Sequence, residues 1–203
     1  MSVSSSNLLP TVLLLASGRG ERFRASGGQV HKLQAMLGSQ TVLEHSLAAV
    51  RASGLPWHLE QAEHPGMGDS IAAAVRATSG AHGWLILPAD LPLIQSSTLQ
   101  RVAQALQQLA GQSVAVVMPV LQKTGGARAH PVGFAATCRS SLMALSGDQG
   151  AARLMKSLGA LELVVDDIGS VRDIDTVEDL AWAADWLAQR PNLATSSLSG
   201  RSS

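Results

Sequence analysis

Short apolar runs that end at glycine or proline constrain the fold of this chain more than any other feature of its sequence. The first run, Thr11 to Ala16, leads into a glycine-rich segment, and a second run, Trp84 to Pro88, leads into the turn residues 89–92. Runs of this kind are typical of parallel strands that are buried on both faces. Helical patterns lie between them. We therefore predict an α/β fold with a mostly parallel sheet flanked by helices.

The other predicted helices and strands are based on hydrophobic periodicity and on capping residues. Thr41 with Glu44, and Thr176 with Asp179, have the spacing of capping boxes. One of the two serines at 96 and 97 is the expected N-cap of the helix that follows them. Helices are predicted at 41–52, 70–78, 98–109, 148–158 and 176–189, further strands at 113–120, 131–136 and 161–165, and a loop at 17–31.

Composition narrows the possible functions. The chain has 203 residues, which suits one domain at 11–190 between a flexible N-terminus (1–10) and a disordered, Ser- and Asn-rich tail (191–203). Basic and acidic residues both number 15, so no nucleic-acid partner is indicated. No apolar run approaches the roughly 18 residues of a membrane span, and no basic signal-like start is present. We expect a cytoplasmic protein with no membrane partner, in which the single Cys138 is buried.

The glycine-rich segment after the first strand is suited to phosphate. In Ser17-Gly18-Arg19-Gly20, backbone amides can approach an anion closely. The guanidinium of Arg22 can form bidentate hydrogen bonds to phosphate oxygens, and Lys32 supplies a mobile point charge. A flexible surface loop with solvated charges is the alternative. The segment is not a Walker A loop, because the Gly-Lys-Ser/Thr ending is missing.

Three aspartates follow predicted strands or precede a helix. Asp90 follows a buried strand between prolines, where a rigid carboxylate can ligate Mg²⁺, although a lone aspartate is more often a turn residue. Asp173 and Asp175 are alternate residues, so both carboxylates can face one site. We favour Asp173 as the second metal ligand and include Asp175 as its neighbour, since Asp175 can equally begin the last helix.

Three more segments have the composition of substrate loops, or of simple turns. Gly66-Met67-Gly68-Asp69-Ser70 enters a helix whose N-terminus can hold a base, ribose or phosphate. The segment 125–131 carries Arg128 and His130, and Gly147-Asp148-Gln149-Gly150 opens another helix. The other histidines, among them His58 and His64, show no metal-ligand spacing.

Together these segments resemble the MobA-like nucleotidyltransferase family, and most closely its molybdenum cofactor cytidylyltransferase branch. They occur in the family's order and span roughly residues 11 to 185. The matching pieces are Leu15-Ala16-Ser17-Gly18-x-Gly20-x-Arg22-Phe23 with Lys32, Gly66 to Ser70, Pro88-Ala89-Asp90-Leu91-Pro92, His130-Pro131-Val132, Gly147 to Gly150, and Asp173 to Leu180.

The resemblance implies a single Rossmann-like nucleotidyltransferase domain that joins CTP to the phosphate of molybdopterin and releases pyrophosphate. It implies catalytic roles for Arg22, Lys32 and Asp90, and Mg²⁺ ligation by Asp90 and Asp173 with Asp175 beside them. The nucleotide would contact Leu15, Ala16, Ser17, Gly18, Gly20, Arg22, Lys32, Gly68, Asp69 and Ser70. The pterin acceptor would contact Arg128, His130, Asp148 and Gln149.

Two departures from the family pattern bear on this interpretation. The gap from Arg22 to Lys32 is long, and only about ten residues separate Leu55 from Gly66, where the family has room for a further strand and helix. A shortened sheet is therefore expected. Guanylyl transfer to the same cofactor and nucleotidyl transfer to a sugar phosphate are alternative activities. A non-catalytic chaperone that carries molybdenum cofactor to a molybdoenzyme client is the alternative from another class.

Overall fold

The computed structural model of the protein describes residues 9–122, 125–148 and 150–189. The terminal segments 1–8 and 190–203, and Gln149, lie outside the described residues. The predicted tail (191–203) and most of the predicted flexible N-terminus (1–10) are therefore not described. The strands are β1 (Thr11–Leu15), β2 (Met36–Leu37), β3 (Gln40–Thr41), β4 (Trp57–Glu60), β5 (Gly83–Pro88), β6 (Val116–Leu121), β7 (Ala127–Arg128), β8 (Val132–Ala135) and β9 (Leu161–Val165).

One mixed sheet forms the centre of the fold. Among the described residues it has seven strands in the order β4-β1-β5-β8-β6-β7, and β9 also pairs with β6. The pairs β1–β4, β1–β5 and β6–β9 are parallel, whereas β8 runs antiparallel to both β5 and β6. The predicted strand at 131–136 is thus present, but it inserts between parallel units with the opposite direction. β2 and β3 form a separate hairpin.

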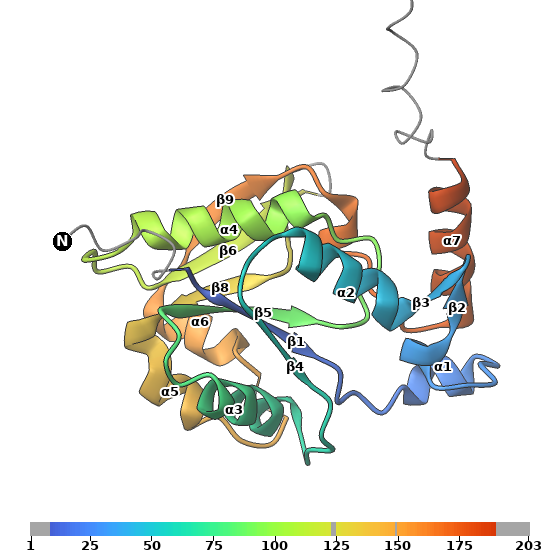
Figure 1. Cartoon of the computed structure of the whole chain (residues 1–203), viewed down its shortest axis with the longest axis horizontal. Helices are drawn as coiled ribbons and strands as arrows, with labels where there is room; N and C mark the ends of the chain where they lie inside the picture. Colours follow the sequence, from blue (N-terminus) through green and yellow to red (C-terminus); the bar gives the residue numbers. More distant parts are fainter. Residues whose placement is uncertain (1–8, 123–124, 149, 190–203) are drawn as a thin grey trace, which may run out of the picture.

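Helices cover both faces of this sheet (Figure 1). They are α1 (Glu21–Ala25), α2 (Val42–Ala52), α3 (Met67–Ala77), α4 (Ser96–Gln108), α5 (Arg139–Met143), α6 (Ala152–Leu158) and α7 (Val177–Ala188), with the 3₁₀ turns η2 (Lys32–Gln34), η4 (Ala136–Cys138) and η5 (Ile168–Ser170). No helix in the described ranges combines the length and the apolar character needed to cross a bilayer.

The alternation of side chains along β1 divides the core in two. Val12 and Leu14 join the cluster beneath α2 and α4, and Leu13 and Leu15 join the cluster beneath α3 and α5. All four are buried, as the wholly apolar run requires. Cys138, predicted to be buried, belongs to the second cluster and is 3% exposed.

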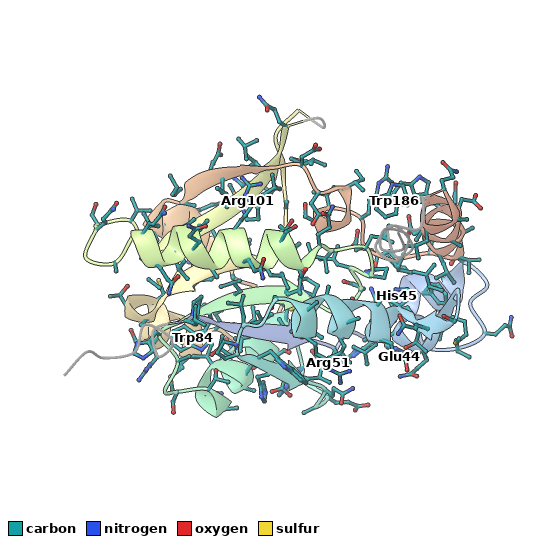
Figure 2. The ribbon with its side chains drawn as sticks, turned by 45° about the horizontal axis from the view of Figure 1, so that its top comes forward. Glu44, His45, Arg51, Trp84, Arg101 and Trp186 are labelled. Atoms are coloured by element: carbon teal, nitrogen blue, oxygen red, sulfur yellow. The ribbon has the colours of Figure 1, made fainter. Side chains whose placement is uncertain are left out.

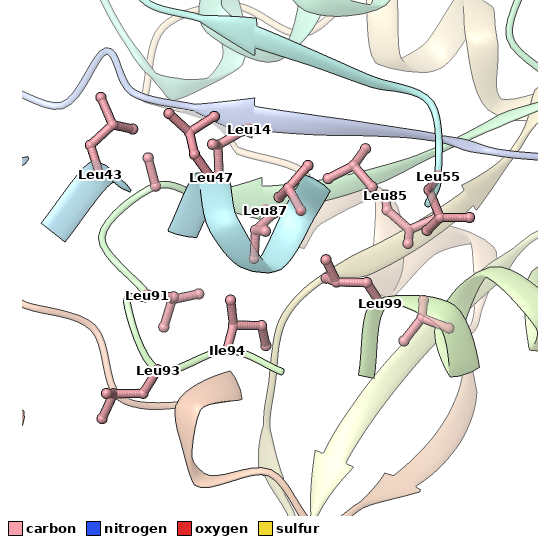
Figure 3. Packing of buried hydrophobic residues seen from close by; sticks show 14 of the residues in the cluster. Leu14, Leu43, Leu47, Leu55, Leu85, Leu87, Leu91, Leu93, Ile94 and Leu99 are labelled. Atoms are coloured by element: carbon pink, nitrogen blue, oxygen red, sulfur yellow. The ribbon is translucent and has the colours of Figure 1, made fainter. Parts of the chain in front are cut away.

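The first cluster shows how sheet and helices interlock. In Figure 3, Leu14 and Leu87 of the sheet lie near Leu47 of α2, and Leu85 lies near Leu55. Helix α4 is also tied to the edge of the sheet, because the Arg101 guanidinium donates a hydrogen bond to the carbonyl of Val164 in β9, at 2.8 Å (Figure 2).

The capping predictions were right for two helices and wrong for a third. Thr41 with Glu44, and Thr176 with Asp179, form complete capping boxes at the starts of α2 and α7. The N-cap of α4 is Gln95 rather than Ser96 or Ser97, and its own side chain makes no capping bond. The distant, buried Asp167 satisfies this helix start instead, accepting hydrogen bonds from the Gln95 amide (2.9 Å) and the Thr98 hydroxyl (2.7 Å).

Two further expectations were wrong. The segment 17–31 is not all loop, because α1 forms within it around the buried Phe23, and a helix of five residues is too short to show periodicity. The short segment between Leu55 and Gly66 does not lose its strand. It forms the edge strand β4, which pairs with β1 in parallel, and the chain then passes to α3 without an intervening helix.

Candidate active site

The carboxyl ends of β1 and β5 bring the first two predicted segments together. Leu15 and Pro88 are register partners, and the amide of Ala89 donates to the carbonyl of Leu15 at 2.9 Å. The glycine loop and Asp90 therefore leave the sheet side by side, at the edge where α/β sheets bind ligands. The amide of Ile174 donates to the carbonyl of Asp90, also at 2.9 Å, and this bond holds the segment before α7 against the same edge.

Three carboxylates meet at this point. One oxygen from each of Asp90, Asp173 and Asp175 lies within 4.8 Å of the other two. Asp173 is exposed, and the other two are partly buried. The second oxygen of Asp90, Oδ1, is buried and has no hydrogen-bond partner among the described residues. A hard divalent cation takes oxygen ligands of this kind, so the group fits such an ion.

Lys32 lies among these carboxylates. Its ammonium is 2.6 Å from Asp90 Oδ2 and 2.9 Å from Asp175 Oδ1. The side chain is only 10% exposed, and its residue begins the 3₁₀ turn η2, whose N-cap is His31. The sequence predicted a mobile point charge. The structure shows a buried and paired one, since a lysine without compensating charge would be costly at this depth.

These contacts shift several pKa values. Burial favours a lower pKa for Lys32, but the charges and hydrogen bonds of Asp90 and Asp175 outweigh it and raise the pKa above its ordinary value. Hydrogen bonding to Lys32, with a further contribution from Arg22, lowers the pKa of Asp175. Desolvation and the neighbouring Asp90 carboxylate raise the pKa of Asp173. Asp173 is thus the carboxyl of the group whose charge is least compensated.

A cavity of about 390 Å³ opens beside this group. Arg22 lies at its edge, where its exposed guanidinium is 2.7 Å from Asp175 Oδ2. A second cavity of about 740 Å³ adjoins it and shares the glycine loop and His64. The first cavity is lined by residues 17–23, Lys32, residues 64–67, Asp148 and Asp175.

The start of the glycine loop is held by two contacts. The Ser17 hydroxyl donates to Ser70 of α3 at 2.8 Å, and a ring nitrogen of His31 is 2.7 Å from the Gly18 carbonyl. Gly20 has a φ of +63°, which disfavours any other residue. Leu15 lies in the core and lines neither cavity, whereas Ala16 lines the second. His31 was not predicted to contribute to the site. Its position in the sequence, between the glycine loop and Lys32, was the only feature that could have indicated this role.

Two of the three predicted substrate loops, at 66–70 and 147–150, contact each other. Gly68 and Ser70 are buried, and Asp69 accepts a hydrogen bond from the amide of Gly147 at 2.8 Å. None of these three lines the first cavity, whose wall on this side comes from residues 64–67. Asp148, predicted to bind the acceptor, does line that cavity and is exposed.

Two other predicted acceptor residues, Arg128 and His130, line neither cavity, and Gln149 lies outside the described residues. Arg128 is exposed on β7 and lines neither of them. His130 is close enough to Asp90 for an electrostatic interaction. Burial of the His130 imidazole lowers its pKa. Its Nδ1 is buried and has no hydrogen-bond partner in the described part of the chain.

A buried acid at the end of β4 was missed by sequence reasoning. Glu60 is 8% exposed, and its carboxylate lies 3.4 Å from His58 Nε2 and 3.2 Å from His64 Nε2. It also accepts a hydrogen bond from the Ala62 amide at 3.1 Å. The carboxylate thus anchors the segment that leads to His64, which lines both cavities. No pattern in the sequence indicated that a strand ends at Glu60.

Residues 48–163, more than half of the chain, match the model of the MobA-like NTP transferase domain. The chain belongs to the MobA-like NTP transferase family. This membership makes it a nucleotidyltransferase and confirms the family predicted from the motifs. The matched range contains Asp90, the Gly66–Ser70 segment and Asp148, while Lys32 and Asp173 lie outside it.

A curated relative and two solved structures accompany this MobA-like match. The chain is 39% identical over 127 residues to the purine catabolism protein PucB of Bacillus subtilis (strain 168), in an alignment that spans 60% of the chain and 58% of PucB. Rv0371c from Mycobacterium tuberculosis H37Rv, solved in complex with manganese, is similar with a TM-score of 0.67 and 22% identity, covering 87% of this chain and 98% of that one.

The second structure is the molybdopterin-guanine dinucleotide biosynthesis protein A of Archaeoglobus fulgidus. Its TM-score is 0.59 and its identity 16%, covering 89% of this chain and 100% of that one. Because both identities are low, the two structures are evidence for the fold only. They confirm the predicted α/β fold.

Proposed function

We propose that this protein transfers CMP from CTP to the terminal phosphate of molybdopterin and releases pyrophosphate. The observation that carries the proposal is the meeting of Asp90, Asp173 and Asp175 beside Lys32 and the glycine loop, at one edge of the sheet. Family membership supports nucleotidyl transfer. The name of the Archaeoglobus fulgidus structure supports a molybdopterin-type acceptor, and the Rv0371c complex supports a divalent ion.

The reaction is a substitution at the α-phosphorus of CTP. An oxygen of the acceptor phosphate forms the new bond to that phosphorus, and the bond from the phosphorus to the oxygen bridging to the β-phosphate breaks. Pyrophosphate leaves with the electron pair. The acceptor phosphate is already anionic near neutral pH, so no strong general base is required, and catalysis depends on positioning and charge neutralisation.

Different residues of the site bind the triphosphate, the metal ion and the acceptor. The amides of Ser17, Gly18 and Gly20 and the charges of Arg22 and Lys32 hold the triphosphate. Asp90 and Asp173, with Asp175 beside them, would hold Mg²⁺. When bound, the ion neutralises phosphate charge and orients the triphosphate. Asp148 lines the same cavity as Lys32 and Asp175, and we assign it to the acceptor together with Gln149.

The choice of CTP rests on the start of the glycine loop. Ala16-Ser17-Gly18 stands where a double glycine would favour a larger base. A difference of one methyl or hydroxymethyl group is worth only about 1–3 kcal/mol in a pocket. GTP is the alternative donor, in keeping with the name of the Archaeoglobus fulgidus protein.

A non-catalytic chaperone is less well supported. That interpretation depended on a surface exposed by a lost strand–helix unit. The strand of that unit is present as β4 and occupies the edge of the sheet, although no helix follows it before α3. The three carboxylates and Lys32 would also have no purpose in a protein that bound only the finished cofactor. In our proposal one catalytic domain at 11–190 works in the cytoplasm and supplies cofactor to a molybdoenzyme client.

Pyrophosphate release tests the function directly. The purified protein is incubated with molybdopterin, Mg²⁺ and each of CTP, GTP, ATP and UTP. We expect release with CTP to exceed release with the other three, and to require molybdopterin. Preference for GTP would establish the guanylyl alternative, and release from none of the four would contradict the proposed function.

A further inference from the structure

The first turn of α3 joins two loops that are far apart in the sequence. On one side Ser70 accepts a hydrogen bond from Ser17 of the glycine loop, at 2.8 Å. On the other side Gly147 contacts the same turn through both of its backbone groups. Its carbonyl accepts from the Gly68 amide, and its amide donates to Asp69 Oδ2, each at 2.8 Å.

The backbones at this junction approach so closely that side chains are excluded. A Cβ built on Gly66 would lie 2.2 Å from the carbonyl carbon of Gly147 and 2.7 Å from the amide nitrogen of Asp148. Gly147 itself has a φ of +59°, a conformation that favours glycine. The loop at 147–148 therefore packs directly on the backbone at the start of α3, and Asp69 supplies the side-chain bond that holds it there.

The element that precedes this loop also rests on α3. The Arg76 guanidinium, near the end of α3, donates to the Met143 carbonyl at the end of α5, at 3.0 Å. α5 and the loop are thus attached to α3 at both ends of the helix, while Ser70 fixes the helix to the glycine loop. Residues 64–67 and Asp148 line the same cavity as Lys32 and Asp175.

From this junction we propose that Asp69 is a positioning residue, which sets Asp148 and the acceptor against the nucleotide. The inference rests on the proposed function, because the two loops are taken as the nucleotide and acceptor sides of one reaction. The sequence suggested that Asp69 contacts the nucleotide. Its bond to Gly147 points to a different role, in which it orders the loop on the acceptor side without touching either substrate.

An acid in the first turn of a helix has an ordinary alternative role. Asp69 is the third residue of α3, where a negative charge is favourable whatever it contacts. The two roles separate on substitution. Asp69→Asn removes the charge but keeps an oxygen that can accept from Gly147, whereas Asp69→Ala removes both.

The test compares these two variants, with Glu178→Ala as a matched control, since Glu178 is an exposed first-turn acid of α7. The measurements are amide hydrogen exchange at Gly147, the dissociation constant of CTP, and the KM for molybdopterin. In Asp69→Ala we expect exchange at Gly147 and the KM for molybdopterin to rise about tenfold, as suits the loss of a hydrogen bond to a charged group. The dissociation constant of CTP should change by less than about twofold. In Asp69→Asn, exchange at Gly147 and the KM for molybdopterin should both return most of the way to their wild-type values.

Three outcomes would overturn the inference. Unchanged exchange at Gly147 in Asp69→Ala would show that the bond does not order the loop. Equal losses in Asp69→Asn and Asp69→Ala would assign the effect to the helix charge. Weaker CTP binding with an unchanged KM for molybdopterin would make Asp69 a nucleotide residue. A wild-type protein inactive with CTP and molybdopterin would contradict the proposed function instead, and exchange at Gly147 would still decide whether Asp69 orders the loop.

Discussion

The Lys32 ammonium lies 2.6 Å from Asp90 Oδ2, so a buried cation from the protein is paired with the carboxylate that follows β5. Lys32 also reaches Asp175, and no other lysine of the described residues approaches this acidic group. The group that we assign to the triphosphate therefore also stabilises the carboxylates that we assign to the metal. Stability, metal binding and nucleotide binding should consequently respond together to substitution of Lys32.

Lys32→Met should destabilise the protein by about 2 kcal/mol near neutral pH, because it leaves Asp90, Asp173 and Asp175 without their internal cation. Mg²⁺ should then stabilise the variant more than it stabilises the wild type, while the dissociation constant of CTP should rise. Thermal unfolding with and without MgCl₂, and calorimetry with CTP, measure these effects. Lys156→Met, at an exposed position on α6, is the control. A variant as stable as the wild type without Mg²⁺ would argue against the pairing.

Asp167→Ala should lower the free energy of unfolding by about 3 kcal/mol, since it leaves several buried donors without an acceptor. Asp167 is 2% exposed and accepts from Gln95, Thr98 and Gly169. Denaturant unfolding measures the change, with the exposed Asp185→Ala as its reference. A loss no larger than that of the reference would show that α4 does not depend on this distant acid.

Glu60 should contribute stability that depends on pH. Burial opposes the shift, but hydrogen bonds from His64 and the Ala62 amide, and from His58, lower the pKa of Glu60 below its ordinary value of 4.5. Because the folded pKa is the lower one, the contribution is complete above pH 4.5 and is lost as the pH falls through the folded value. Glu60→Gln should thus lower the Tm at pH 7, and the difference from the wild type should shrink as the pH falls below 4.5. A difference that is constant with pH would contradict this account.

Local patterns in the sequence were enough to predict much of this fold. The buried strand at 84–88 and the capping boxes at Thr41 and Thr176 depend on neighbouring residues alone, and the structure has all of them. The meeting of Asp90 with Asp173 was also predictable, because ligands bind where strands of such a sheet end.

Features that depend on distant partners could not be predicted in this way. β8 runs antiparallel because of where β5 and β6 lie, and its own apolar pattern does not encode direction. The burial of Lys32 requires two carboxylates that are 58 and 143 residues away along the chain. Likewise, Asp69 and Gly147 contact each other only once α3 and α5 have packed together.

Substitution of Asp90 tests the central claim most directly. Mn²⁺ binding in the presence of CTP is measured by electron paramagnetic resonance, and pyrophosphate release with CTP, Mg²⁺ and molybdopterin is measured in parallel, for the wild type and for Asp90→Ala. We predict that the variant keeps the wild-type circular dichroism spectrum but loses tight Mn²⁺ binding and all turnover, because the change removes a ligand and no core side chain. Full turnover in Asp90→Ala, or Mn²⁺ binding equal to that of the wild type, would contradict the account.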